Sequence, residues 1–290
     1  MAAKTVVRIP DRSVTGAPSS ATTAPLKASY WLSGAVAVGM AAASLLGVLI
    51  EGLYHDDAWG REAFRGGDVV TLALAAPMLA VSLLLVARGS RRAVPVWIGM
   101  LLYAVYNYAY AVFGAAFNDA FILHIAILSA SIFALACALP QLDLRAVVWA
   151  LRDAIAVRTI GVFLALVGVL QGGLWAFLLI RNIATGELIA DVPVAGQHLV
   201  FALDLGLLAP SLVLAGILLF RHTPFGFVFG PAMAVMGAVY QLNLMLAGVF
   251  QDRADVAGVK AFPPESIFLT ATFVVAALLL LWPRRTAARA

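Results

Sequence analysis

The chain has 290 residues, of which 63% are hydrophobic and 12% are charged. A soluble domain carries roughly 25% charged residues, so this composition excludes an ordinary water-soluble protein and predicts one that is embedded in lipid. The net charge is +4, which would indicate a nucleic-acid partner unless membrane topology accounts for the basic residues. A single cysteine, Cys137, excludes an internal disulfide.

The chain begins with a segment, residues 1–28, that is rich in Ala, Ser, Thr and Pro. It contains no short apolar core followed by a cleavage site, so no removable signal peptide is expected. A segment of this composition buries too little apolar surface to fold alone. Residues 1–28 are therefore predicted to form a disordered cytoplasmic tail.

Eight apolar runs follow, each close to the roughly 20 residues that a helix needs to cross about 30 Å of hydrocarbon. The runs are continuously apolar rather than alternating, which favours helices over the strands of a barrel. The sequence therefore predicts an all-α, polytopic membrane helical bundle with about eight transmembrane helices. The predicted spans are residues 29–50, 69–87, 94–115, 120–139, 159–180, 199–220, 226–249 and 266–282.

A connector, residues 140–158, separates the fourth and fifth runs. Within it, Val147, Leu151 and Ile155 recur at helical spacing, which is typical of a short amphipathic helix on the membrane surface. Residues 283–290 form a second predicted tail.

The basic residues predict the orientation. If the N-terminus is cytoplasmic, 14 of the 19 Lys and Arg residues lie on the inner side, in agreement with the positive-inside rule. Both termini and the connector are then cytoplasmic, and no nucleic-acid partner is expected. The Ala, Gly and Arg bias indicates the plasma (cytoplasmic) membrane of a bacterium. Most acidic residues fall near the outer loops, either as solvated side chains or as a vestibule that concentrates cations.

The two halves of the chain, residues 29–139 and 159–282, align with each other. Pro77 matches Pro210 in the second and sixth runs, and Tyr106 matches Tyr240 in the third and seventh. Four spans in each half would make two parallel four-helix repeats, related by an axis along the membrane normal. Chance similarity between leucine-rich helices is the alternative.

Polar residues within the spans collect in the predicted outer half of the membrane, whereas the inner half is almost purely aliphatic. This asymmetry predicts a polar cavity that opens outward and binds a ligand. The candidate cavity residues are Asp204, His124, His198, Asn107, Tyr106, Gln241, Asn243 and Gln171. Two groups have simpler explanations: His198 could mark the membrane interface, and Asp68, Asn118, Asp119 and Ser266 stand where helix caps belong.

Asp204 is the strongest candidate. A carboxylate within a span costs several kcal/mol unless it is paired or protonated, so such acids are functional by default. No Lys or Arg is expected at a matching depth, so its partners must be neutral groups. It either exchanges a proton or holds a cation, or it has a structural hydrogen-bonding role.

The sequence favours a carrier or channel for a small solute or ion. The alternatives are a membrane enzyme with its site in the outer leaflet half, and a non-catalytic receptor or assembly subunit. No catalytic residues, metal site or cofactor are expected, because the four histidines do not cluster at ligand spacing and no nucleophile motif is present. The expected partners are the lipid bilayer and a small solute or cation, and the sequence does not specify an oligomeric state.

The layout of four plus four spans is similar in outline to that of haem A synthases. The resemblance is one of topology alone. Those proteins use paired histidines, and the second and eighth runs of this chain contain none, so haem binding is not expected.

Overall fold

A computed structural model describes residues 24–187, 189 and 194–282. Residues 1–23 of the predicted N-terminal tail and all of the predicted tail 283–290 lie outside the described residues. Residues 24–28, assigned to the tail from the sequence, belong instead to the first helix.

The described residues form an all-α bundle without strands. Eight helical segments are long and apolar enough to cross a membrane, which confirms the predicted number of spans. The elements are α1 (Ala24–Leu49), α2 (Ala58–Val70), η2 (Thr71–Ala75), α3 (Ala76–Ala87), α4 (Val94–Phe113), α5 (Phe121–Ala138), η3 (Leu139–Gln141), α6 (Leu144–Leu151), α7 (Val157–Thr185), α8 (Val194–Leu203), η4 (Asp204–Leu208), α9 (Ala209–Phe220), α10 (Gly226–Arg253) and α11 (Pro264–Leu281).

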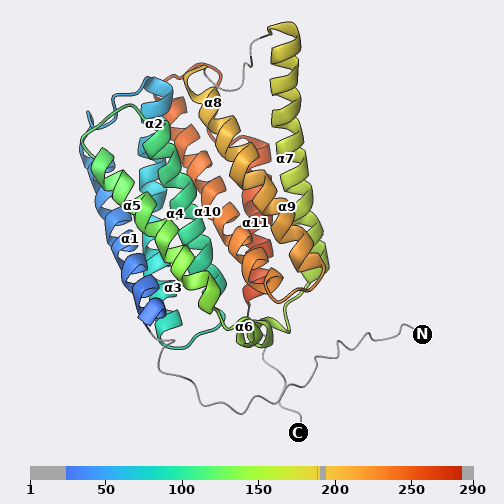
Figure 1. Cartoon of the computed structure of the whole chain (residues 1–290). Helices are drawn as coiled ribbons and strands as arrows, with labels where there is room; N and C mark the ends of the chain where they lie inside the picture. Colours follow the sequence, from blue (N-terminus) through green and yellow to red (C-terminus); the bar gives the residue numbers. More distant parts are fainter. Residues whose placement is uncertain (1–23, 188, 190–193, 283–290) are drawn as a thin grey trace, which may run out of the picture.

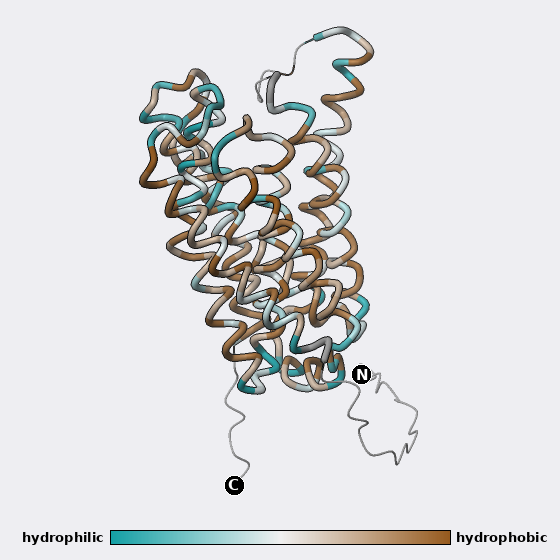
Figure 2. Tube along the Cα trace, turned by 60° about the vertical axis from the view of Figure 1, so that its left-hand side comes forward, coloured by the Kyte–Doolittle hydropathy of each residue, from teal (hydrophilic) through white to brown (hydrophobic). Residues whose placement is uncertain are grey.

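Helices α4 and α10 form the centre of the bundle, where they pack against each other (Figure 1). α2 also packs against α10, and α8 contacts α4, so each of the two central helices contacts both halves of the chain. The side chains of Trp97 and Tyr103 on α4 are fully buried. Apolar residues run along the length of the helices and hydrophilic ones collect towards the ends, the pattern expected of a bundle surrounded by lipid (Figure 2).

The short helix α6 lies across one end of the bundle (Figure 1). The Asp143 carboxylate caps its N-terminus by accepting a hydrogen bond of 3.0 Å from the backbone N–H of Ala146. Val147 and Leu151 are buried, whereas Trp149 on another face is exposed. This arrangement agrees with the predicted spacing for Val147 and Leu151. The prediction is wrong for Ile155, which lies beyond the end of α6 and is exposed.

The second span begins earlier than its hydropathy predicts. Asp57 caps α2 by accepting a 2.8 Å hydrogen bond from the N–H of Gly60, so the helix starts at Ala58 rather than near residue 69. The predicted capping role of Asp68 is therefore wrong, because Asp68 lies in the last turn of α2 and is buried. Asn118 does cap a turn, since its Oδ1 accepts a 3.0 Å hydrogen bond from the N–H of Ala120 before α5.

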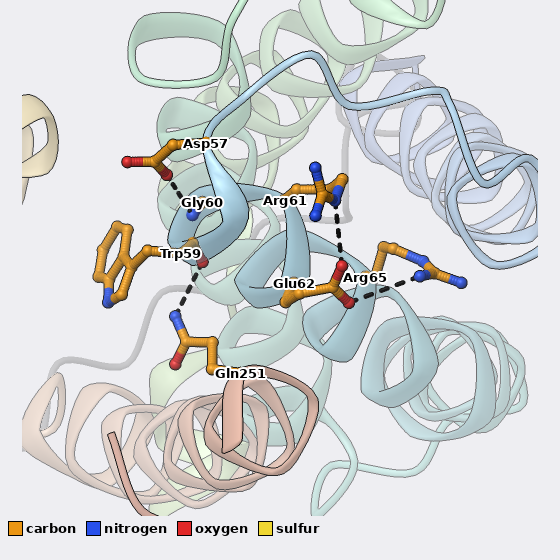
Figure 3. Close-up of polar contacts among 7 residues, drawn as sticks. All are labelled: Asp57, Trp59, Gly60, Arg61, Glu62, Arg65 and Gln251. Carbon is orange, nitrogen blue, oxygen red and sulfur yellow. Dashed lines mark hydrogen bonds and ion pairs between the residues drawn. The ribbon is translucent and has the colours of Figure 1, made fainter. Parts of the chain in front are cut away.

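The charged start of α2 packs into the bundle because its charges pair with one another (Figure 3). Glu62 is buried and accepts from Arg61 at 3.1 Å and from Arg65 at 3.5 Å. The Gln251 side chain on α10 donates a 2.9 Å hydrogen bond to the carbonyl of Trp59. The bond from Gln251 joins the start of α2 to the end of α10, whereas the two ion pairs lie within α2 itself.

Two spans contain a π-helical turn, and each turn is followed directly by an Ala-Pro pair. In η2 the N–H of Ala76 donates to the carbonyl of Thr71, five residues back, and Pro77 follows. In η4 the N–H of Ala209 donates to the carbonyl of Asp204, and Pro210 follows. Proline has no N–H and its ring clashes with the carbonyl four residues back, so it disrupts the α-helical pattern one turn before itself. π turns of this kind occur frequently at functional sites.

Helices α7 and α9 approach closely through glycine. A Cβ atom added to Gly216 would lie 2.5 Å from the backbone N of Ala165 and the carbonyl oxygen of Gly161. Small residues at such a crossing let two backbones come into contact.

We expect Gly216→Val to lower the free energy of unfolding by about 1–3 kcal/mol, because the added side chain overpacks the contact between α7 and α9. Thermal unfolding in detergent measures the effect. Gly173→Ala on α7 is the matched control, since a Cβ there meets nothing within 4 Å. Equal melting temperatures for the two variants would contradict the close packing.

Candidate functional site

Asp204 is the first residue of the π turn η4 and is 2% exposed. Its carboxylate accepts three hydrogen bonds from two other helices. The Tyr106 hydroxyl on α4 donates to Oδ1. On α7, Gln171 Nε2 donates to Oδ2 at 3.0 Å and Trp175 Nε1 donates to the same oxygen at 2.7 Å. Gln171 and Trp175 are four residues apart on one helix and so share the face that meets Asp204.

All three donors are neutral. Among the described residues the ion pairs are Arg61–Glu62, Arg65–Glu62, Arg152–Asp153 and Arg181–Glu187, and none includes Asp204. A buried carboxylate is costly without a compensating charge, even when it is well hydrogen-bonded. The site therefore presents a buried carboxyl group that lacks a cationic partner within the described part of the chain.

Aromatic rings enclose this carboxylate. The hydroxyl of Tyr240 on α10 lies 3.4 Å from that of Tyr106, and the two rings meet edge to face at 5.1 Å between centroids. The ring of Tyr110 lies 5.5 Å from that of Tyr106. Trp175 in turn packs against Phe201 at 5.2 Å. These rings keep water away from Asp204 in this conformation.

A second polar cluster centres on Tyr103, one turn before Tyr106 on α4. Its hydroxyl lies 2.8 Å from Thr71 Oγ1 and accepts a 2.8 Å hydrogen bond from Asn243 Nδ2. Asn243 Nδ2 also lies 3.3 Å from the side-chain oxygen of Asn107. Thr71 is the first residue of η2, as Asp204 is of η4, so each π turn begins with a side chain that bonds a tyrosine of α4.

The eight predicted site residues separate into three groups. Tyr106 and Gln171 bond Asp204 directly, and Asn107 and Asn243 belong to the Tyr103 cluster. The remaining three lie apart from both. His124 on α5 packs 5.7 Å from the Tyr108 ring, His198 is exposed, and Gln241 is half-buried on α10.

The sequence predicts an open polar cavity around Asp204, but within the described residues this side chain is buried. The carboxylate is enclosed because tyrosine and tryptophan rings fill the space beside it. Two grooves of about 450 and 490 Å³ lie beside Pro210 and Pro77 instead, and Asp204 lines neither.

The sequence did not predict two features of the polar interior, the hydrogen bond from Trp175 to Asp204 and the burial of a second acid, Asp68. Trp175 could have been found from its position four residues after Gln171. Asp68 accepts a 2.6 Å hydrogen bond from the hydroxyl of Tyr54, and Gly47 on α1 leaves room for its carboxylate. Tyr54 lies in the loop between α1 and α2. Burial, with the neighbouring Asp68 as a smaller cause, raises the pKa of the Tyr54 phenol above its ordinary value.

The chain matches no protein-family model, and no curated protein or solved structure is similar to it. Its class therefore follows from the fold alone. Eight apolar helices of membrane-spanning length define a multi-pass integral membrane protein in contact with the lipid bilayer.

We expect Asp204→Asn to lower the free energy of unfolding by about 1–3 kcal/mol, the cost of a buried group left unsatisfied. If the NH₂ group of the new amide faces Gln171 and Trp175, donors face each other. If it faces Tyr106, that hydroxyl must turn to accept, and it loses the oxygen to which it donates. Thermal unfolding in detergent checks this. Asp143→Asn is the control, because asparagine is an equally good helix cap. An unchanged melting temperature for Asp204→Asn would contradict the three hydrogen bonds.

Tyr54 predicts a pH dependence. Tyrosine ionises at about pH 10 in an unfolded chain. A raised pKa in the folded state means that the unfolded state loses its proton first, so the stability from this group is present below pH 10 and declines above it. We expect wild type to lose stability above pH 10 more steeply than Tyr54→Phe, as measured by the melting temperature against pH. Parallel slopes for the two proteins would refute this assignment.

Proposed function

We propose that the protein is a carrier or channel for a small ion or solute, in which Asp204 binds a proton or cation. The observation that carries this proposal is the buried carboxylate whose three donors, Tyr106, Gln171 and Trp175, are all neutral. Such a group must either take up a proton or hold a cation to offset the cost of its charge in an apolar medium. Binding and release of that positive charge is the chemistry that the site supports.

The position of the site supports a transport role. Asp204 belongs to the sixth span but bonds α4 of the first half and α7 of the second. In our proposal, residues 29–139 and 159–282 are two parallel repeats with the binding site between them. Two observations favour this arrangement: the π turns precede Pro77 and Pro210 alike, and Tyr106 meets its proposed equivalent, Tyr240.

Transport requires that the enclosed carboxylate be reached from each side in turn. The π turn offers a place for this change, because its backbone hydrogen bonds are already shifted from the α-helical pattern. Movement of the Tyr106 and Tyr240 rings away from Asp204 would expose its carboxylate. We place the termini and α6 in the cytoplasm, so that this opening faces outward and the acidic outer loops attract cations to it.

Flux in proteoliposomes tests the proposal with two probes, protons followed by an enclosed pH-sensitive dye and radioactive sodium. We expect wild type to conduct one of them above the level of protein-free liposomes, and Asp204→Asn to fall to that level. Tyr106→Phe keeps the carboxylate and removes one donor, so it should retain a measurable flux. Asp143→Asn controls for the loss of a charge elsewhere.

Two results would contradict the proposal. One is a flux of equal size in wild type and Asp204→Asn when both are folded, as judged by size-exclusion chromatography. The other is the absence of proton and sodium flux in wild type.

A further inference from the structure

A groove of about 490 Å³ follows α3 for about two turns past Pro77. Pro77, Val81 and Leu85 form one wall, and Val96 of α4 and Leu281 of α11 contribute to the rest. Its volume lies within the range of small-molecule sites in proteins, roughly 300–1,000 Å³. Val81 and Leu85 are exposed, so the groove opens on an apolar surface that faces the surrounding lipid.

One end of this groove is basic. Ser90 and Arg92 line it there, and Arg88 and Arg91 are exposed in the same turn between α3 and α4. None of these arginines forms an ion pair with an acidic residue that the structure describes. Arg92 donates one hydrogen bond of 3.1 Å to the carbonyl of Leu281. A guanidinium group carries five N–H donors, so others remain to bind an anion.

The groove at Pro210 provides an internal comparison. It has about 450 Å³ and lies beside Pro210 of α9, which occupies the same place after η4 as Pro77 does after η2. Its lining consists of glycine, alanine, proline and aliphatic residues, with no basic group. A groove thus lies beside the proline in both spans. Of the two grooves, the one at Pro77 has a basic end and the one at Pro210 does not.

We propose that the groove at Pro77 binds an anionic phospholipid, with an acyl chain along α3 and the phosphate at Arg91 and Arg92. Arginine forms charge-assisted, often bidentate, hydrogen bonds with phosphate oxygens. Basic residues at the membrane surface each add appreciably to the affinity for anionic lipid. α3 ends at the end of the bundle where α6 lies (Figure 1), so the headgroup would sit at that membrane surface. The proposal is independent of the chemistry at Asp204.

The test uses the full chain, delipidated in detergent. Native mass spectrometry measures the binding of phosphatidylglycerol, phosphatidylcholine with the same acyl chains, and glycerol 3-phosphate. We expect phosphatidylglycerol to bind wild type, and Arg91→Gln/Arg92→Gln to bind it about thirtyfold more weakly, because two basic contacts are lost. Arg221→Gln, at the corresponding end of α9, should bind it as wild type does.

A second pair of variants separates binding from folding, because Arg92 also holds the end of α11. Val81→Phe fills the groove from an exposed position, and Leu214→Phe does the same in the groove at Pro210. Val81→Phe should weaken phosphatidylglycerol binding and Leu214→Phe should not. Equal binding of phosphatidylcholine, binding of glycerol 3-phosphate as strong as that of the lipid, or equal effects of the two phenylalanine variants would each overturn the proposal.

Discussion

The hydrogen bonds to Asp204 are the constraint on which the centre of this bundle depends. In a membrane, helices gain little from the hydrophobic effect when they associate, so packing and interhelical hydrogen bonds hold them together. The Asp204 carboxylate joins its own span to α4 through Tyr106 and to α7 through Gln171 and Trp175. α7 packs mainly against α9, so these bonds also connect it to the core. The same carboxyl group has neutral donors and no ion pair among the described residues. It is therefore both the structural link between these helices and the proposed binding site.

The two π turns show how one sequence pattern produces two different sites. In each, a polar residue begins the π turn six residues before the proline, and that residue bonds a tyrosine of α4. In the second span the residue is Thr71, which is neutral and completes a cluster with Tyr103 and Asn243. In the sixth it is Asp204, which brings a charge. If the halves are repeats, one kept a structural polar contact and the other acquired an ionisable one.

The sequence predicts the eight spans well, because each is a long apolar run. In lipid the backbone must satisfy its own hydrogen bonds, and a continuously apolar run does so as a helix. It also identifies Asp204 and its partners Tyr106 and Gln171 by residue type and depth. It fails for the start of α2, where Glu62 is buried only because Arg61 and Arg65 pair with it after folding. The sequence also does not predict that aromatic rings enclose Asp204. The packing of these rings depends on how each helix is rotated about its axis, which hydropathy does not encode.

The most direct measurement is the infrared absorption of protonated carboxyl groups, comparing wild type with Asp204→Asn in lipid bilayers. The buffer should contain only cations that are too bulky for the site. We expect a carboxylic-acid band in wild type that is absent from Asp204→Asn, because without a small cation the buried group must hold a proton. Identical spectra would mean that Asp204 is ionised without any compensating charge. That result would contradict its assignment as the site that binds a proton or cation.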